Sequence, residues 1–194
     1  YNPDLVTLEA ISDTRCLILL GEPGLGKTQA LRTEQSLLES KIEQAGQTLL
    51  FVDLAQYGSE DRLIRELFSS PEFLSWEQGS HQLHVFLDSF DECLLKIETL
   101  ATLLSEKFKH YQKSADRLYL RITCRTAIWP IILEDNIREI WGKDQVGVYE
   151  LAPLRRIDIV EAASTSNLSP ETFVEEIQKK KLTSLAIKPI TLKF

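Results

Sequence analysis

A glycine-rich motif between an apolar run and a helical pattern most restricts how this chain folds. Its residues are Gly21, Glu22, Pro23, Gly24, Leu25, Gly26, Lys27 and Thr28. The motif follows the apolar residues 16–20 directly. Glycines let successive backbone N–H groups turn toward one anion, and the spacing G-x-x-x-x-G-K-[ST] is that of a phosphate-binding loop. The sequence therefore predicts that phosphates bind at this strand-to-helix turn.

The residues that end the motif have the chemistry needed to bind phosphates and a metal ion. A helix that begins near Lys27 would direct the positive end of its dipole at the anion. The Lys27 ammonium can reach the β- and γ-phosphates of a nucleotide, and the Thr28 hydroxyl can bind Mg²⁺. We expect the nucleotide contacts to extend from Gly21 through Gln29.

Four further short apolar runs follow the motif, and helical patterns separate them. The five predicted strands are residues 16–20, 49–54, 83–87, 118–124 and 146–151. Apolar residues at helical spacing predict helices over 28–45, over 60–68 after the N-cap Ser59, and over 94–108. Short apolar strands that alternate with helices are typical of a parallel sheet covered on both faces. The predicted fold class is α/β, a three-layer P-loop NTPase sandwich with a five-stranded parallel sheet.

The pattern of the sequence changes near residue 152. After Pro153 no further strand is predicted, and helices are expected over 155–163 and over 170–181, the second with Ser169 as N-cap. We therefore predict a nucleotide-binding domain over residues 1–152 and the start of a small helical subdomain over residues 153–194. The chain contains no methionine and ends just after an apolar cluster, so we interpret it as a segment of a longer protein.

Acidic residues gather just after the predicted strand 83–87. Asp88 follows this strand directly, and Asp91 and Glu92 come three and four residues later. A carboxylate at the end of a buried strand is costly unless it meets a cation, so we expect Asp88 to bind Mg²⁺ together with Thr28. Asp91 and Glu92 are either an acidic pair that stabilises a helix N-terminus or groups that act on the nucleotide.

Composition limits the partners of the chain. The sequence has 22 basic and 29 acidic residues and a net charge of −7, which argues against direct nucleic-acid binding or an anionic membrane surface. Its three cysteines, Cys16, Cys93 and Cys124, lie far apart in apolar surroundings. They fit a reduced, cytoplasmic compartment better than a disulfide framework. No apolar run reaches the length of a membrane span.

Three segments resemble the NACHT family, within the STAND class of signal-transduction ATPases. The segment "LDSFDE" is similar to the family motif of an apolar strand, Asp, a small residue, any residue and then Asp-Glu, with Ser89 where glycine is usual. The segment "LRITCRTAIWP" resembles the segment in which an arginine, here Arg125, senses the γ-phosphate. The segment "LAIKPITL" is similar to the one whose proline, here Pro189, packs against adenine.

This resemblance implies an ATPase that works as a switch. It implies ATP and ADP as ligands, with Mg²⁺, and it places the predicted strand 118–124 between strands 16–20 and 83–87. Asp91 or Glu92 would orient the attacking water, and Arg125 would sense the γ-phosphate. Hydrolysis would be slow and regulatory, and the nucleotide state would control self-oligomerisation of the full-length protein. Flanking domains would sense an unknown trigger, as in bacterial antiviral defence or signal transduction.

Two other classes of P-loop protein, and the role of Asp53, stay open. A motor or loader ATPase of the AAA-like type would have an acidic residue at position 89, where this chain has Ser89. A small-molecule kinase of the P-loop class would have a mobile, arginine-rich lid, whereas the pair Arg155 and Arg156 lies beyond the predicted sheet. Asp53, at the end of the second predicted strand, either approaches the site or caps the following loop.

Overall fold

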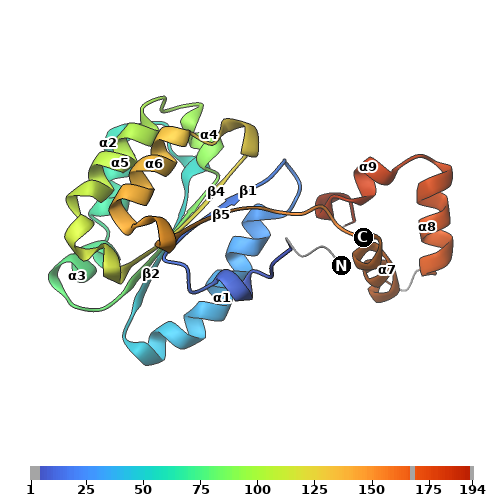
Figure 1. The fold of residues 1–194 in the computed structure, drawn as a ribbon, viewed down its shortest axis with the longest axis horizontal. Coiled ribbons are helices and arrows are strands. Elements are labelled where there is room, and N and C mark those ends of the chain that lie inside the picture. The colour runs from blue at the N-terminus through green and yellow to red at the C-terminus, as the bar shows by residue number, and fades with distance from the viewer. Residues whose placement is uncertain (1–4, 167–168, 193–194) are drawn as a thin grey trace.

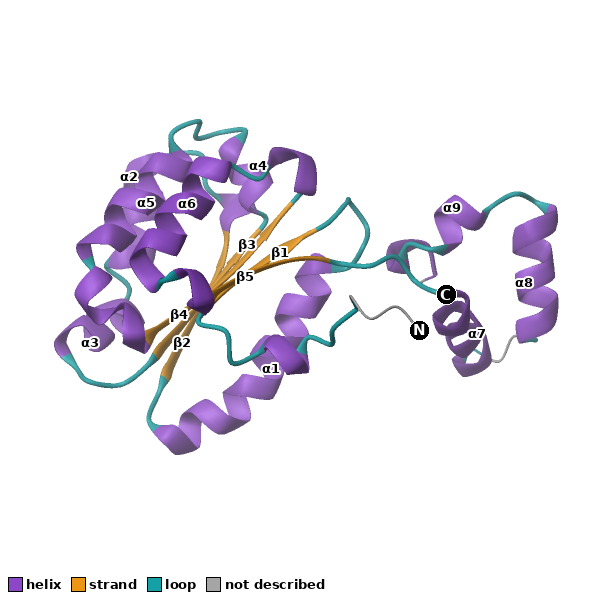
Figure 2. Cartoon of the chain, viewed as in Figure 1, coloured by secondary structure: helices purple, strands orange, loops and turns teal. Residues whose placement is uncertain are grey.

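The fold was analysed in a computed structural model, which describes residues 5–166 and 169–192 (Figures 1 and 2). The ends of the predicted ranges 1–152 and 153–194 lie outside the described residues. The strands are β1 (Cys16–Leu20), β2 (Thr48–Asp53), β3 (Leu83–Asp88), β4 (Leu118–Cys124) and β5 (Val146–Glu150). The helices are α1 (Lys27–Ala45), α2 (Glu60–Phe68), α3 (Pro71–Gln78), α4 (Phe90–Leu94), α5 (Leu100–His110), α6 (Ile131–Trp141), α7 (Arg156–Thr165), α8 (Pro170–Lys179) and α9 (Thr183–Ala186).

The five strands form one parallel sheet in the order β2-β3-β4-β1-β5. This confirms the predicted α/β fold class and the expected position of β4 between β1 and β3. All strands point the same way, so their carboxyl ends lie at one edge of the sheet. Loops that follow β1, β3 and β4 therefore meet there, which is where ligands bind in open α/β sheets.

Strand order also decides which face each helix covers. The connection from β1 to β2 runs toward one edge of the sheet, and the later strand-to-strand connections run the other way. Crossovers between parallel strands are right-handed, so α1 must lie on the opposite face from the other crossover helices. Figure 1 shows α1 on one side of the sheet and α2, α3, α5 and α6 on the other.

Each face of the sheet has its own core. The larger core joins the α2–α6 side to alternate strand residues such as Val85, Leu87 and Ile122, all fully buried. The smaller core lies under α1 and is built on Leu17, Leu19, Leu31 and Phe86. Because side chains alternate along a strand, Asp88 shares the α1 face with Phe86. This alternation directs the Asp88 side chain toward the loop that precedes α1.

The predicted continuous helix over 94–108 is wrong. The segment divides into α4 and α5, with a turn over residues 95–99. In this turn Ile97 is buried, the Lys96 ammonium donates to the carbonyl oxygen of Ala55, and the Thr99 hydroxyl donates to the Glu60 carboxylate. These long-range contacts stabilise the turn against the helical pattern. Helices α3 and α6 were not predicted, although Ser70 caps α3 and Pro71 occupies its first position.

Helices α7, α8 and α9 pack together beyond the sheet (Figure 2). Their small core consists of Ile159, Val174 and Ala186. Backbone hydrogen bonds join this part to itself and to the loop after β5, including one from Leu154 N–H to the Ile187 carbonyl at 2.8 Å. Within the described residues, no helix has the length and apolar character required to cross a membrane.

Candidate functional site

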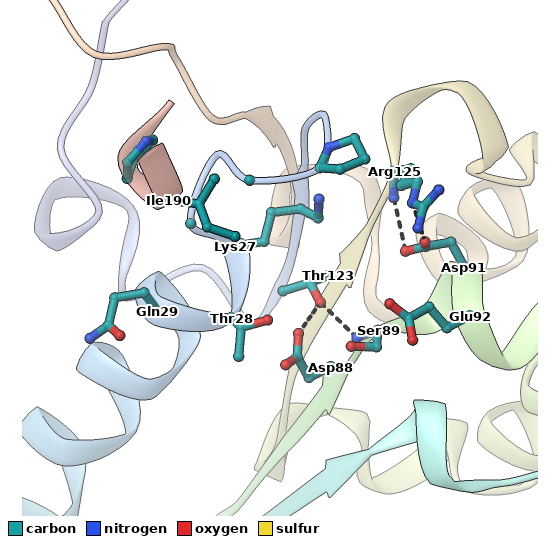
Figure 3. Close-up of a pocket in the computed structure, with 14 residues that line it drawn as sticks. Lys27, Thr28, Gln29, Asp88, Ser89, Asp91, Glu92, Thr123, Arg125 and Ile190 are labelled. Carbon is teal, nitrogen blue, oxygen red and sulfur yellow. Dashed lines mark hydrogen bonds and ion pairs between the residues drawn. The ribbon is translucent and has the colours of Figure 1, made fainter. Parts of the chain in front are cut away.

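A cavity of about 390 Å³ lies at the carboxyl ends of β1, β3 and β4 (Figure 3). Three segments far apart in the sequence line it, together with a turn near the C-terminus. The lining residues are Pro23, Gly24, Gly26, Lys27, Thr28, Gln29, Asp88, Ser89, Asp91, Glu92, Thr123, Arg125, Pro189 and Ile190.

The glycine-rich loop adopts the conformation that its glycines allow. Gly24 and Gly26 have φ values of 85° and 93°, in the left-handed region that other residues rarely adopt. Gly26 is the N-cap of α1, and no side chain caps this helix end. The first N–H groups of α1 and its positive dipole end therefore face the cavity, as an anion site requires.

The Lys27 ammonium lies within the loop. It donates to the carbonyl oxygens of Gly21 at 2.6 Å and Glu22 at 3.3 Å. Gly21, Glu22 and Leu25 do not line the cavity, although the sequence predicted all three as nucleotide contacts. The carbonyl oxygens of Gly21 and Glu22 accept from Lys27, and they hold its charge at the edge of the cavity.

Asp88 is held by a residue that the sequence analysis did not single out. The Thr123 hydroxyl, at the end of β4, donates to the Asp88 carboxylate and accepts a hydrogen bond from the Ser89 backbone N–H at 3.0 Å. Thr123 is fully buried, and Asp88 is 3% exposed. Since β3 and β4 are neighbours and alternation places both side chains on the α1 face, the pairing of strands brings them together. The signal that could have identified Thr123 is its polar side chain at the end of a buried strand.

Ser89 has a left-handed backbone, with φ of 60° and ψ of 42°. A residue with a Cβ atom pays about 1–2 kcal/mol for this conformation. The turn between β3 and α4 requires this left-handed conformation. That requirement gives a physical reason why glycine is usual at this position in the family motif that the segment "LDSFDE" resembles.

Asp91, Glu92 and Arg125 border the opposite side of the cavity from the glycine-rich loop (Figure 3). Arg125 Nε lies 2.7 Å from Asp91 Oδ2. Glu92 is exposed and forms no hydrogen bond or ion pair through its side chain within residues 5–166 and 169–192. Burial, with a smaller contribution from Asp91, raises the pKa of the neighbouring Cys124 thiol to about 12. That thiol therefore stays protonated.

The turn Pro189–Leu192 closes one side of the cavity. The Ile190 N–H donates to the Gly24 carbonyl oxygen at 3.4 Å. A Cβ atom placed on Gly26 would lie 3.8 Å from Pro189 Cγ, within van der Waals contact. Pro189 thus borders the loop. Its packing against adenine stays a prediction, and Ile190 was not foreseen.

Asp53 is not among the residues that line the cavity. Its side chain accepts hydrogen bonds from the Ala55 N–H at 3.1 Å and from the Gln56 side chain at 3.0 Å. Of the two alternatives left open by the sequence, the structure shows the cap of the following turn. The pairing of Asp53 with Asp88 in the sheet register does not bring it into the site.

The residues present fit a magnesium ion bound mainly by phosphate. Mg²⁺ commonly takes one or two protein ligands together with phosphate oxygens and water. Thr28 and Asp88 both line the cavity, and Figure 3 shows their oxygens pointing into the same part of it. Among the described residues, no group of three or more His, Cys, Asp or Glu side chains could hold a metal. A site made of one hydroxyl and one carboxylate therefore needs the nucleotide to complete it.

The five-stranded parallel sheet and the glycine-rich loop before α1 together identify the fold as that of the P-loop NTPases. No protein-family model and no curated protein matches this sequence. Solved structures do match, and two of them are PCH-2 from C. elegans and the ORC2 protein of Aeropyrum pernix, the latter solved as ADPNP-ADP complexes. Both of these neighbours are AAA+ ATPases.

Both solved structures share the fold of this chain but little of its sequence. PCH-2 matches with a TM-score of 0.55 and 16% identity, over 90% of this chain and 42% of that chain. ORC2 matches with a TM-score of 0.56 and 14% identity, over 79% of this chain and 46% of that chain. This chain thus spans less than half the length of either neighbour. The likeness establishes the fold.

Proposed function

We propose that this chain binds and slowly hydrolyses ATP, as the nucleotide-binding module of a switch protein. The observation that carries the proposal is the cavity that brings Lys27, Asp88 and Arg125 together from three separate segments. Lys27 supplies a cation on a flexible side chain, Asp88 a buried carboxylate and Arg125 a guanidinium. Together these groups can bind a triphosphate and its metal ion.

Each residue has a proposed role toward the nucleotide. The backbone N–H groups of Gly24, Gly26, Lys27 and Thr28 and the Lys27 ammonium would bind the phosphates, and Gln29 would lie beside them. Thr28 and Asp88 would hold Mg²⁺, which supplies charge neutralisation on the phosphate oxygens when bound. Arg125 would sense the γ-phosphate, and Pro189 would border the adenine.

We further propose that the module is of the NACHT type within the STAND class. Ser89 supports this, because many P-loop hydrolases with steady turnover have a glutamate at that position. In this view residues 1–152 bind nucleotide and residues 153–194 begin a helical subdomain. The nucleotide state would control oligomerisation of a longer cytoplasmic protein whose flanking domains sense a trigger, in antiviral defence or another signalling role.

An AAA-like ATPase with steady turnover is the second candidate, and the fold likeness to two AAA+ ATPases favours it equally. The two candidates differ in rate. A switch is expected to retain nucleotide through purification and to turn over slowly, whereas a motor is expected to turn over many times a minute and to lose its nucleotide.

Isothermal titration with ATP and Mg²⁺ tests the shared part of both candidates. We expect Lys27→Ala to abolish binding, because the loop loses the only side-chain cation that it contains. Lys113→Ala, at an exposed lysine far along the chain, is the matched control and should bind as the wild type does. Micromolar affinity retained by Lys27→Ala would refute the assignment of the loop.

A further inference from the structure

Asp91 is bound to Arg125 at two points. Its Oδ2 atom lies 2.7 Å from Arg125 Nε, and its Oδ1 atom accepts a hydrogen bond from the Arg125 backbone N–H at 3.2 Å (Figure 3). The Asp91 side chain is only 5% exposed. One buried carboxylate on α4 thus holds both the main chain and the side chain of the residue that follows β4.

This contact leaves the tip of Arg125 available. The ion-pair contact at 2.7 Å is made by Nε, the nitrogen nearest the side-chain stem, and the two Nη groups at the tip donate no hydrogen bond within the described residues. Arg125 is 39% exposed and lines the cavity. With Nε held against Asp91, the Nη groups of the guanidinium can still donate in parallel to phosphate oxygens.

The same contact makes Asp91 a poor partner for water. Both of its oxygens are already committed to Arg125, and a buried carboxylate that lost this partner would carry a large desolvation cost. Glu92, one residue on, is exposed, lines the same cavity and has no side-chain partner in the described part of the chain. The two neighbouring acids therefore lie in different environments.

We propose that Asp91 is a positioning residue that acts through Arg125, which leaves Glu92, of the two acids considered from the sequence, to orient the attacking water. This inference rests on the proposed ATPase function. During hydrolysis the water oxygen bonds to the γ-phosphorus while the bond to the β–γ bridging oxygen breaks. ADP leaves with that electron pair, and the proton of the water passes to Glu92 and then to solvent.

Two measurements on the full chain separate these roles: the turnover number, and the ratio of ATP affinity to ADP affinity. We expect Asp91→Asn to lower the affinity ratio about 5- to 10-fold, as Arg125→Gln does, because the guanidinium loses its anchor. We expect Glu92→Gln to leave the affinity ratio unchanged and to lower kcat by about 10²- to 10⁴-fold.

The double variant Asp91→Asn/Arg125→Gln tests whether Asp91 acts only through Arg125. It removes both charges of the pair, so it remains measurable even if Asp91→Asn alone fails to fold. We expect its affinity ratio and kcat to equal those of Arg125→Gln, since the two changes interrupt one interaction. A further loss of kcat in the double variant would overturn the proposal.

Other outcomes distinguish this inference from the proposed function. If Asp91→Asn stops turnover with an unchanged affinity ratio while Glu92→Gln turns over normally, then Asp91 orients water and the proposal fails. In that case the ATPase function still stands. If the wild-type chain binds neither ATP nor ADP, the proposed function itself fails, and the assignment of Asp91 with it.

Discussion

The guanidinium of Arg121 on β4 lies 2.6 Å from the carboxylate of Glu34 on α1, and the two side chains are only 2% and 5% exposed. Arg121 also donates to the carbonyl oxygens of Ser12, Thr14 and Arg15 in the segment before β1. A single buried side chain therefore ties the helix that follows the glycine-rich loop to the sheet and to the N-terminal segment.

We expect Arg121→Met to lower the free energy of unfolding by about 3–5 kcal/mol, because it leaves Glu34 buried without a cation. The double variant Arg121→Met/Glu34→Leu should recover much of this loss, since no buried charge remains. Lys109→Met is the control, because Lys109 and its partner Glu139 are about 60% exposed and such pairs contribute about 0–1 kcal/mol. Denaturant unfolding measures all three, and equal losses for Arg121→Met and Lys109→Met would contradict the prediction.

Thr123→Val should weaken the binding of Mg²⁺ with ATP more than it weakens the fold. Valine keeps the shape of threonine but removes the hydroxyl that donates to Asp88 and accepts from the Ser89 N–H. Losing a group that orients a metal ligand typically costs about 10- to 100-fold in metal affinity. Titration of Mg²⁺ at fixed ATP measures this effect. Thr102→Val, on the exposed side of α5, should leave the Mg²⁺ affinity unchanged, and equal affinities for the two variants would argue against a role for Thr123.

Gly24→Ala should disturb the loop through both strain and collision. Gly24 has a φ of 85°, and an added Cβ atom would lie 2.7 Å from Ile190 Cγ2. Gly46→Ala provides the matched control, because Gly46 has a φ of 63° and nothing lies within 4 Å of its added Cβ. Both variants should lose about 1–2 kcal/mol of stability from strain, while only Gly24→Ala should lose nucleotide affinity.

A second variant checks the cause of that loss. Adding Ile190→Ala to Gly24→Ala removes the atom that the new Cβ meets, so part of the lost nucleotide affinity should return. If no affinity returns, the collision with Ile190 does not explain the effect.

Stability should fall below pH 6.5 because of His84. Burial, with a smaller contribution from Arg121, lowers the pKa of this histidine from 6.5 to about 4. Its Nε2 atom lies 3.1 Å from the Gln47 side-chain oxygen, and its ring stacks on Tyr119 with a centroid distance of 4.6 Å. Between pH 6.5 and 4 the unfolded chain binds a proton that the folded chain does not, so stability declines as the pH falls through this window.

The expected loss from His84 is about 3 kcal/mol over the whole window, since one pKa unit corresponds to about 1.4 kcal/mol. Denaturant unfolding of the wild type and His84→Gln at several pH values measures it. The stability of His84→Gln should depend less on pH than that of the wild type between pH 4 and 6.5. His110→Gln, which changes an exposed histidine, should keep the wild-type dependence, and parallel curves for all three proteins would contradict the assignment.

Local patterns in the chain predicted much of the fold. All five strands were predicted to within one residue at either end. The right-handed crossover rule then accounts for the position of α1 on the opposite face from α2, α3, α5 and α6. The division of the predicted helix 94–108 could not be foreseen, because the turn depends on contacts with Ala55 and Glu60. Helical periodicity depends only on residues within one segment, so it cannot indicate a turn that contacts from other segments stabilise.

The sequence by itself determined the glycine-rich turn before α1 and the position of Asp88, because glycine spacing and strand alternation act over a few neighbouring residues. Only the tertiary structure decided which groups meet around that turn. Two hydrogen bonds, from Thr123 to Asp88 and from the Arg125 N–H to Asp91, join residues 34 or more apart in the sequence. The Arg121–Glu34 pair joins residues 87 apart. The first two form because parallel strand order places distant strand ends side by side, and the third forms because α1 packs over β4. No short stretch of sequence contains these relationships.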